Sequence, residues 1–373
     1  MTRLKRLAPQ LVALAIILTA NSFLSPGFLD VSFQNGRFYG SLVDILVRGA
    51  PVGLLAVGMT LVIASKGIDL SVGAVMAICG ATAVSLTLSD TSLPAVLAAT
   101  LAVGLACGIW NGFLVAVLRI QPIVATLILM VAGRGIAQLI TEGAILTFND
   151  PGLAFLGSGA VFGIPVPILL LAFVALAVGL TVRRTALGLL LESVGINRTA
   201  STLAGVRTRF LLIAVYALSG LTAAMAGIIV AADIRGADAN NAGLWLELDA
   251  ILAVVIGGNS LLGGRFSIVA SLIGALIIQS INTGILMAGY PPEFNLIIKA
   301  GIIVVILATL AALVLDVVAL WFFIFLLVAL LIVFIVVVQG APADACDYRW
   351  RHVRSNGRLV SAKQSSNVWL GTC

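Results

Sequence analysis

Residues 45–88 read ILVRGAPVGLLAVGMTLVIASKGIDLSVGAVMAICGATAVSLTL. Two apolar runs, residues 45–65 and 71–88, are separated here by a short break that contains Lys66, Gly67 and Asp69. A membrane-spanning helix needs about 20 mostly apolar residues, so each run is long enough to cross a bilayer. The stretch therefore predicts two adjacent spanning helices joined by a tight, polar turn.

The same pattern continues in both directions along the chain. Further apolar runs cover about residues 7–24, 94–117, 122–140, 166–181, 211–231, 247–262, 266–288 and 296–313. The 373 residues are 61% hydrophobic and 10% charged, with a mean hydropathy of +1.20, whereas soluble domains carry about 25% charged residues. We therefore predict an all-α polytopic membrane protein with about ten transmembrane helices, some of them discontinuous, and exclude a soluble fold.

The basic residues fall between the apolar runs and predict the orientation. Arg3, Lys5 and Arg6 precede the first run, and no clean cleavage site follows it, so we interpret this run as a retained helix rather than a signal peptide. With an inside start, the arginine-rich loop 183–210 also falls inside, as the positive-inside rule requires. We expect a multi-pass membrane protein with a cytoplasmic N-terminus.

The net charge of +6 is explained by this topology signal. The basic residues do not gather around aromatic residues in a soluble module. Membrane lipid is therefore an expected partner, and nucleic acid is not.

The last part of the chain does not fit this topology. Residues 317–338 form another apolar run, followed by a tail with five basic residues. An eleventh span would place that tail outside, against the charge rule. We divide the chain into a transmembrane domain, residues 1–313, and residues 314–373. For the second part, a helix in or beside the membrane and a non-native ending, such as a shifted reading frame, both remain open.

The residue inventory argues against an enzyme. His352 in the tail is the single histidine, Cys79 and Cys107 lie inside apolar runs, and no Cys pair has CxxC spacing. A His-based triad or a His/Cys metal site inside the membrane is thereby excluded. The chain also has no Gly-Lys-Ser/Thr and hence no P-loop. We expect no catalytic residues, no metal and no cofactor, and any ATP must be bound by another chain.

Two glycine-rich breaks and one loop carry the mechanistic signals. The breaks are Lys66–Gly73 (KGIDLSVG) and Gly257–Arg265 (GGNSLLGGR), and the segments around them, Leu54–Val75 and Ala250–Ser271, share a layout that suggests an internal repeat. In the first break, Asp69 or Ser71 is placed to cap the following helix. The third segment, residues 191–206, has regularly spaced small and apolar residues, which favours a short surface helix over a plain charge anchor.

Polar residues inside apolar runs are functional candidates because their burial in lipid is costly. The alternative for each is a helix–helix hydrogen bond or an ion pair, for example between Arg134 and Glu247 or Asp249. The translocation-path candidates are Asp69, Ser71, Asn111, Arg134, Glu247, Asp249 and Asn282. Glycines such as Gly104 and Gly108 instead indicate close helix packing.

Several stretches resemble the permeases of bacterial ABC importers of the ribose/galactose family. They are GIDLSVG at 67–73, the small-residue loop with Gly195, Asn197, Ala200 and Gly205, and ELDAI at 247–251 running into Gly257-Gly258. The resemblance covers about residues 8–308. Residues 233–245, DIRGADANNAGLW, resemble the galactofuranose-importing members in particular.

The resemblance implies a set of partners. Such permeases have about ten helices, work as pairs of identical or paralogous subunits, and receive sugar from a periplasmic binding protein. A cytoplasmic ATP-binding subunit drives them through a coupling helix. That helix corresponds here to residues 192–206, with Glu192, Gly195, Asn197, Ala200 and Gly205 as the coupling residues.

The leading hypothesis is the permease subunit of an ATP-driven sugar importer, for a monosaccharide such as galactofuranose. One alternative is an ion- or proton-coupled secondary transporter with Asp69 or Asp249 as the coupling site. Another is a branched-chain amino acid ABC permease.

Overall fold

The computed structural model describes residues 3–24, 27–34, 36–287, 289, 296–297 and 299–301. The chain divides into two compact units, residues 1–297 and 298–373, and the fold described below is that of the first. Most of the predicted run 296–313, the boundary at residue 313 and the whole of residues 314–373 lie outside the described residues.

The described chain is mainly helical, and the helices follow the apolar runs. Their bounds are α1 Arg3–Leu24, α2 Ser41–Ala64, α3 Val72–Leu88, α4 Leu93–Ala116, α5 Pro122–Ile140, α6 Pro151–Ser158, α7 Val166–Arg184, α8 Leu187–Ile196, α9 Arg198–Leu203, α10 Thr208–Asp233, α11 Leu246–Ile256 and α12 Ile268–Met287.

Six of these helices, α2, α4, α5, α7, α10 and α12, are long and apolar enough to cross a membrane. The apolar segments Leu7–Phe23 in α1 and Val72–Leu88 in α3 are shorter. The predicted run 247–262 is a helix only as far as Ile256, because Gly257 and Gly258 end it. The polytopic all-α prediction is thus confirmed, and α11, at 11 residues, is one of the short helical pieces that a discontinuous span requires.

Short antiparallel strand pairs lie between the helices. They are β1 Ser32–Gln34 with β2 Arg37–Tyr39, β3 Leu146–Thr147 with β6 Gly236–Ala237, and β4 Ala160–Val161 with β5 Ile164–Pro165. The β3–β6 pair joins segments that are about 90 residues apart in the sequence. It fixes the loop after α10 to the loop after α5.

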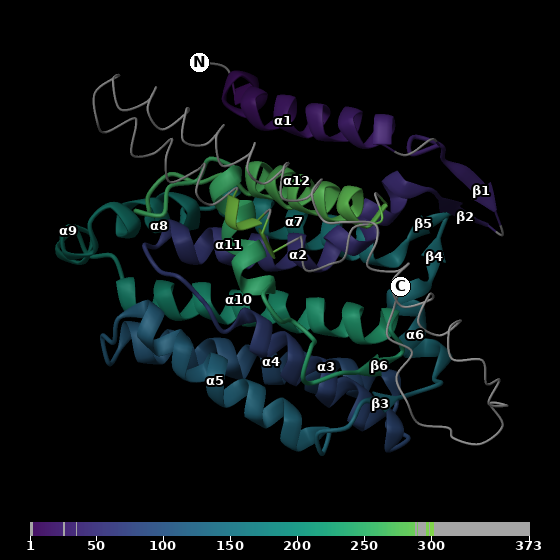
Figure 1. The fold of residues 1–373 in the computed structure, drawn as a ribbon. Helices are drawn as coiled ribbons and strands as arrows, with labels where there is room; N and C mark the ends of the chain where they lie inside the picture. Colours follow the sequence, from purple (N-terminus) through teal and green to yellow (C-terminus); the bar gives the residue numbers. More distant parts are fainter. Residues whose placement is uncertain are drawn as a thin grey trace, which may run out of the picture. The chain divides into compact units, whose positions relative to one another are not determined.

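Helix α10 runs through the middle of this unit, with α3, α4 and α5 on one side and α2, α7 and α12 on the other (Figure 1). Small residues make this possible. A Cβ at Gly108 on α4 would overlap the Tyr216 carbonyl on α10, and one at Gly104 would overlap Ala224. The predicted close packing at these glycines is confirmed, since the two backbones meet without intervening side chains.

The loops gather at two opposite ends. At one end, called the inner end here, the Gly264 N–H donates to the Ala64 carbonyl at 3.0 Å, and Gln10 on α1 donates to Gly257 at 3.1 Å. The α8–α9 segment lies at the same end, and the strands lie at the other, the outer end (Figure 1). This is the grouping of loops that the charge pattern predicts.

Candidate functional site

A buried polar cluster surrounds Asp69 in the break between α2 and α3. Asp69 is 2% exposed, and its Oδ1 accepts from the Ser71 N–H at 3.0 Å and the Ser71 hydroxyl at 2.6 Å. Asn111 on α4 donates to the Ser71 hydroxyl at 2.7 Å and, more weakly, to Asp69 at 3.5 Å. Ser219 on α10 donates to Asp69 Oδ2 at 2.9 Å. Three of the predicted path residues therefore meet around one carboxylate.

The cluster also holds polar atoms that have no hydrogen-bond partner in the described structure. Asn111 Oδ1 and the Tyr216 hydroxyl are both buried and unpaired. Tyr216 lies directly against Gly67, where a Cβ would be 2.5 Å from its hydroxyl oxygen. Buried polar groups are almost always paired, so these two atoms mark a place where a hydroxyl-bearing ligand or water would be stabilised.

Ser71 does not cap α3 in the predicted way. Its side chain makes no capping hydrogen bond with the helix, and Asp69 binds the Ser71 N–H and hydroxyl instead of the donors in the first turn. The reason is local, since an Asp side chain readily bonds the backbone two residues on. The Asp69 carboxylate therefore stabilises the backbone of the α2–α3 break rather than the first turn of α3.

Glu247, the second predicted carboxylate, reaches the same end of α3 from α11. Its Oε2 lies so close to Gly73 that a Cβ there would overlap it. The backbone N–H groups at a helix start favour negative charge, which suits a carboxylate at this position. Asp249, two residues along α11, is also buried.

Arg134 is held by backbone carbonyls rather than by the predicted ion pair. Its Nη1 donates to the Ala239 carbonyl at 3.2 Å and also to the Ala242 carbonyl. Glu247 and Asp238 interact with it electrostatically, but in the described part of the chain neither forms a direct ion pair with it. The loop after α10 supplies these carbonyls, and no pattern in the sequence predicts that this loop folds back onto α5.

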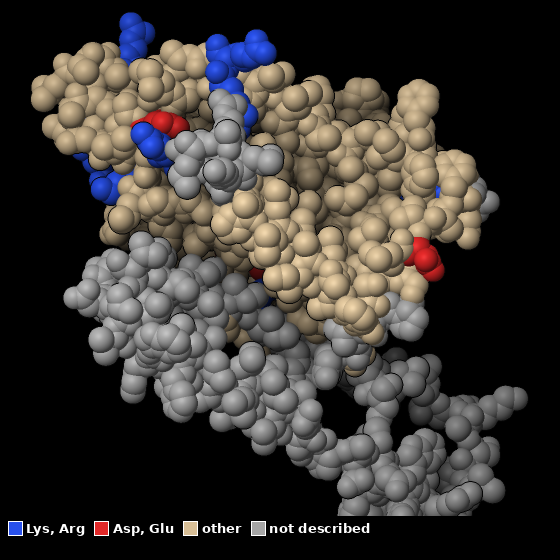
Figure 2. Space-filling model, turned by 90° about the horizontal axis from the view of Figure 1, so that it is seen from above, with Lys and Arg blue, Asp and Glu red and all other residues tan. Residues whose placement is uncertain are grey.

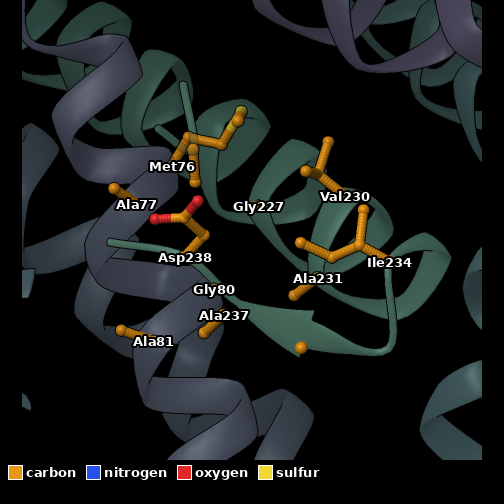
Figure 3. A pocket seen from close by; sticks show the side chains of 12 residues that line it. Met76, Ala77, Gly80, Ala81, Gly227, Val230, Ala231, Ile234, Ala237 and Asp238 are labelled. Carbon is orange, nitrogen blue, oxygen red and sulfur yellow. The ribbon is translucent and has the colours of Figure 1, made fainter. Parts of the chain in front are cut away.

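That loop also closes a narrow cavity at the outer end. The cavity lies between α3 and α10, with Ala237 and Asp238 of the loop in its wall (Figure 3). Its volume of about 10 Å³ is near the minimum for one water molecule. Asp238 is fixed by donation from Asn241 Nδ2 at 2.7 Å and from the Asn240 N–H at 3.0 Å, and these bonds, that of Asn241 first, lower the pKa of its carboxyl.

Residues 192–206, predicted to form the coupling loop and called by that name below, contain the predicted surface helix. The loop covers the end of α8 and the whole of α9, and Asn197 separates the two by accepting from the Ala200 N–H at 2.9 Å as an N-cap. Ala200 and Gly205 are exposed, Glu192 is half-buried, and Gly205 has a φ of +89° with open space around it. The loop presents small residues at the inner end.

Gly195 alone among the coupling residues is wedged between the two glycine-rich breaks. A Cβ on Gly195 would overlap the Ala64 carbonyl and lie 2.7 Å from the Gly264 nitrogen. The Gly195 carbonyl in turn lies against Gly263. The coupling loop is therefore in backbone contact with both breaks at once.

Two further polar features lie apart from Asp69. Asn282 on α12 has a buried Oδ1 without a hydrogen-bond partner among the described residues. On the same helix, Ser280 accepts at its carbonyl from Asn21 of α1 at 2.8 Å. A second network joins Thr60 to Ser271 at 2.7 Å and Asn259 to Ser271 at 2.9 Å. Sequence reasoning did not single out Ser219, Tyr216 or Ser271, because scattered hydroxyl groups are common in apolar helices. Among the described residues no group of His, Cys, Asp or Glu is arranged to hold a metal ion.

Comparison with known proteins identifies the family. The model of the family described as branched-chain amino acid transport system, permease component, matches residues 41–307. The galactofuranose transporter permease protein YtfT of Escherichia coli is 60% identical over 299 residues, which is 80% of this chain and 88% of that protein.

Two further relatives are more distant. The fructose import permease protein FruF of Bifidobacterium longum is 40% identical over 79% of this chain and 85% of its own length. The ribose import permease protein RbsC of E. coli is 38% identical over 80% of this chain and 91% of its own length. With its apolar helices and this match over most of its length, the chain belongs to the family of transport-system permease components and is a multi-pass membrane permease.

Proposed function

We propose that this chain is the permease subunit of an ATP-driven importer for a sugar, a monosaccharide such as galactofuranose. The 60% identity to a galactofuranose permease over 80% of the chain carries the proposal. The fructose and ribose permeases among the relatives support a sugar over a branched-chain amino acid, despite the family's description. The same relatives favour an ATP-driven importer over an ion-coupled transporter.

The polar cluster is the proposed translocation-path element. Asp69, Ser71 and Asn111, joined by Ser219 and Tyr216, offer hydroxyl, amide and carboxylate groups together with an aromatic ring. Neutral sugars are recognised by such hydrogen-bonding groups. Glu247, Asp249 and Arg134 extend this polar zone toward the outer end, and Asn282 on α12, with its unpaired Oδ1, is a further proposed path residue.

The remaining parts of the transporter are proposed as separate chains. A cytoplasmic ATP-binding subunit binds the ATP, so this chain is itself no enzyme and needs no cofactor. A second permease, identical or paralogous, and a periplasmic sugar-binding protein complete the importer. The N-terminus and the coupling loop then face the cytoplasm of a bacterial inner membrane, and movement of the coupling loop turns the path from one side to the other.

Reconstituted uptake tests this proposal. Vesicles that hold the permease, the ATP-binding subunit and internal ATP receive the sugar-binding protein and labelled galactofuranose, ribose, fructose or leucine from outside. We expect uptake of one of the sugars, dependent on ATP and unaffected by an uncoupler. Leucine uptake without sugar uptake, or uptake that needs a proton gradient but no ATP-binding subunit, would overturn it.

A further inference from the structure

A cavity of about 440 Å³ opens at the inner end, between the coupling loop and the α2–α3 break. Ser65, Lys66 and Gly67 form one wall, and the turn from α8 to α9, including Asn197 and Arg198, forms another. Its volume lies within the range of ligand pockets in proteins. The outer cavity, by contrast, holds about one water molecule.

Positive charge converges on this cavity from four separate segments. Lys66 and Arg198 line it, while Arg119, between α4 and α5, and Arg209, at the start of α10, repel Arg198 electrostatically. Partial burial lowers the pKa of Arg198, and the two arginines lower it further. Most of the Lys and Arg side chains seen in Figure 2 lie toward the end that carries α8 and α9 in Figure 1.

Arg198 retains most of its hydrogen-bonding capacity. Its Nη2 donates to the Ala116 carbonyl at 3.3 Å, whereas a guanidinium has five N–H donors. Gathering four like charges at one site is unfavourable unless an anion offsets them. The site therefore has the charge, the donors and the space that an anionic group requires.

We propose that this cavity, the anion socket, receives a side-chain carboxylate of the ATP-binding subunit, with Arg198 and Lys66 as its partners. The proposal rests on the proposed function, which supplies that subunit. Arginine binds carboxylates in a bidentate manner. Arg198 extends from the coupling loop itself, and Lys66 extends from the α2–α3 break on the opposite wall. A docked carboxylate would link α9 to the α2–α3 break.

An anionic phospholipid is the competing occupant, and a second groove fits it better. That groove has a volume of about 320 Å³ and is lined almost entirely by apolar residues of α2, α7, α8 and α10, such as Leu61, Leu191 and Leu211. Thr181 and Val182 lie in its wall, so the exposed Arg183 and Arg184 next to them suit a phosphate headgroup. The anion socket is lined by polar and apolar residues in similar number, with Ser65, Asn197 and the two cations facing Val115, Val194 and Leu212. This more polar lining favours a protein carboxylate there.

The test measures binding of the ATP-binding subunit to the full-length permease in nanodiscs. Arg198→Glu and Lys66→Glu should each weaken binding at least about tenfold, since losing a buried charge pair at an interface costs more than that. Arg198→Lys should recover part of the loss. Arg183→Glu, with a similar exposed charge outside the socket, is the control and should stay within about twofold.

Two further measurements keep the result interpretable. Nanodiscs of phosphatidylcholine alone and with added phosphatidylglycerol separate the two anion sources, and the Arg198→Glu effect should be equal in both. Each exposed Asp and Glu of the ATP-binding subunit is then changed to Lys, and one of these changes should restore binding to Arg198→Glu. Restoration also shows that the variant permease is folded.

Three outcomes would overturn the proposal. An effect that is present only with phosphatidylglycerol assigns the socket to lipid, and an equal loss in Arg183→Glu assigns it to general surface charge. Failure of every Lys change to restore binding also overturns the proposal. If the complex assembles through Arg198 but imports no sugar, the proposed function is contradicted, whereas the proposed binding of a carboxylate in the anion socket is not.

Discussion

Asp69 shows how one buried carboxylate orders a membrane break. It accepts from the Ser71 N–H and from the hydroxyls of Ser71 and Ser219. Irregular backbone at membrane depth is tolerated only where protein or a water-filled cavity surrounds it. The carboxylate therefore satisfies groups that lipid would leave unpaired.

Replacing Asp69 tests whether its charge or its hydrogen bonds matter. Asp69→Asn keeps one oxygen for the Ser71 N–H, and the Ser219 hydroxyl is free to rotate and accept from the new amide, so ATP-driven uptake should stay within about threefold of the original. Asp69→Leu leaves several buried groups unpaired, at about 1–3 kcal/mol each, and should abolish uptake. The measurement is vesicle uptake with internal ATP and an uncoupler present. Equal harm from Asn and Leu would show instead that a proton binds here.

Gly195 and Gly205 form a matched pair in the coupling loop. Gly195→Ala forces the loop away from Ala64 and Gly264, so we expect the ATP hydrolysis stimulated by substrate to fall at least tenfold. Gly205→Ala meets no neighbour but strains a φ of +89°, which costs about 1–2 kcal/mol and should leave stimulation nearly intact. Stimulated ATPase rates of the assembled complex decide between these results. Equal stimulated ATPase rates in the two variants would contradict the role given to the close packing of Gly195 against Ala64 and Gly264.

At the level of elements, α4 and α10 form the most extensive helix pair of the described bundle. Gly104, Gly108 and Gly112 recur every four residues along α4, and each faces the α10 backbone. In a membrane, association of helices depends on such close packing more than on the hydrophobic effect. This pair therefore holds Asn111 against the cluster that Ser219 reaches from the other side.

A larger side chain at Gly108 should separate these helices. Gly108→Leu overlaps the Tyr216 carbonyl, and overpacking of this kind costs about 1–3 kcal/mol or more. The expected result is a lower melting temperature in detergent and loss of uptake. Gly135→Leu on α5 is the control, because a Cβ there has open space. A Gly108 variant as stable as the Gly135 variant would show that α4 and α10 do not pack this closely.

At the level of the whole molecule, the two ends have a predicted sidedness that labelling can check. Phe162 at the outer end is 98% exposed and Leu203 on α9 is 85% exposed. In a chain without native cysteines, Phe162→Cys should react with a membrane-impermeant maleimide in intact spheroplasts. Leu203→Cys should react only after the membrane is permeabilised. The reverse pattern would place the coupling loop outside and contradict the proposed orientation.

The sequence predicted the helices well because hydropathy and helix length depend on local composition. The run 45–65 corresponds to α2, and 94–117 to α4. It predicted the site only in part. Asp69, Ser71 and Asn111 were identifiable as polar residues in apolar runs, but Ser219 is 150 residues from Asp69 and looks like any small residue in a helix. Its role depends on which helices pack together, and that is decided by the fit of small residues in three dimensions.

The wedge at Gly195 has a mechanical consequence. Side chains can accommodate a small displacement by changing rotamer. A contact made through side chains therefore transmits only the part of a movement that such rearrangement does not accommodate. The coupling loop contacts the end of α2 and the second glycine-rich break, Gly257–Arg265, backbone against backbone. Backbone held in helices and tight turns has few alternative conformations. A small displacement of the coupling loop is therefore transmitted to both glycine-rich breaks at the same time and with nearly its full amplitude.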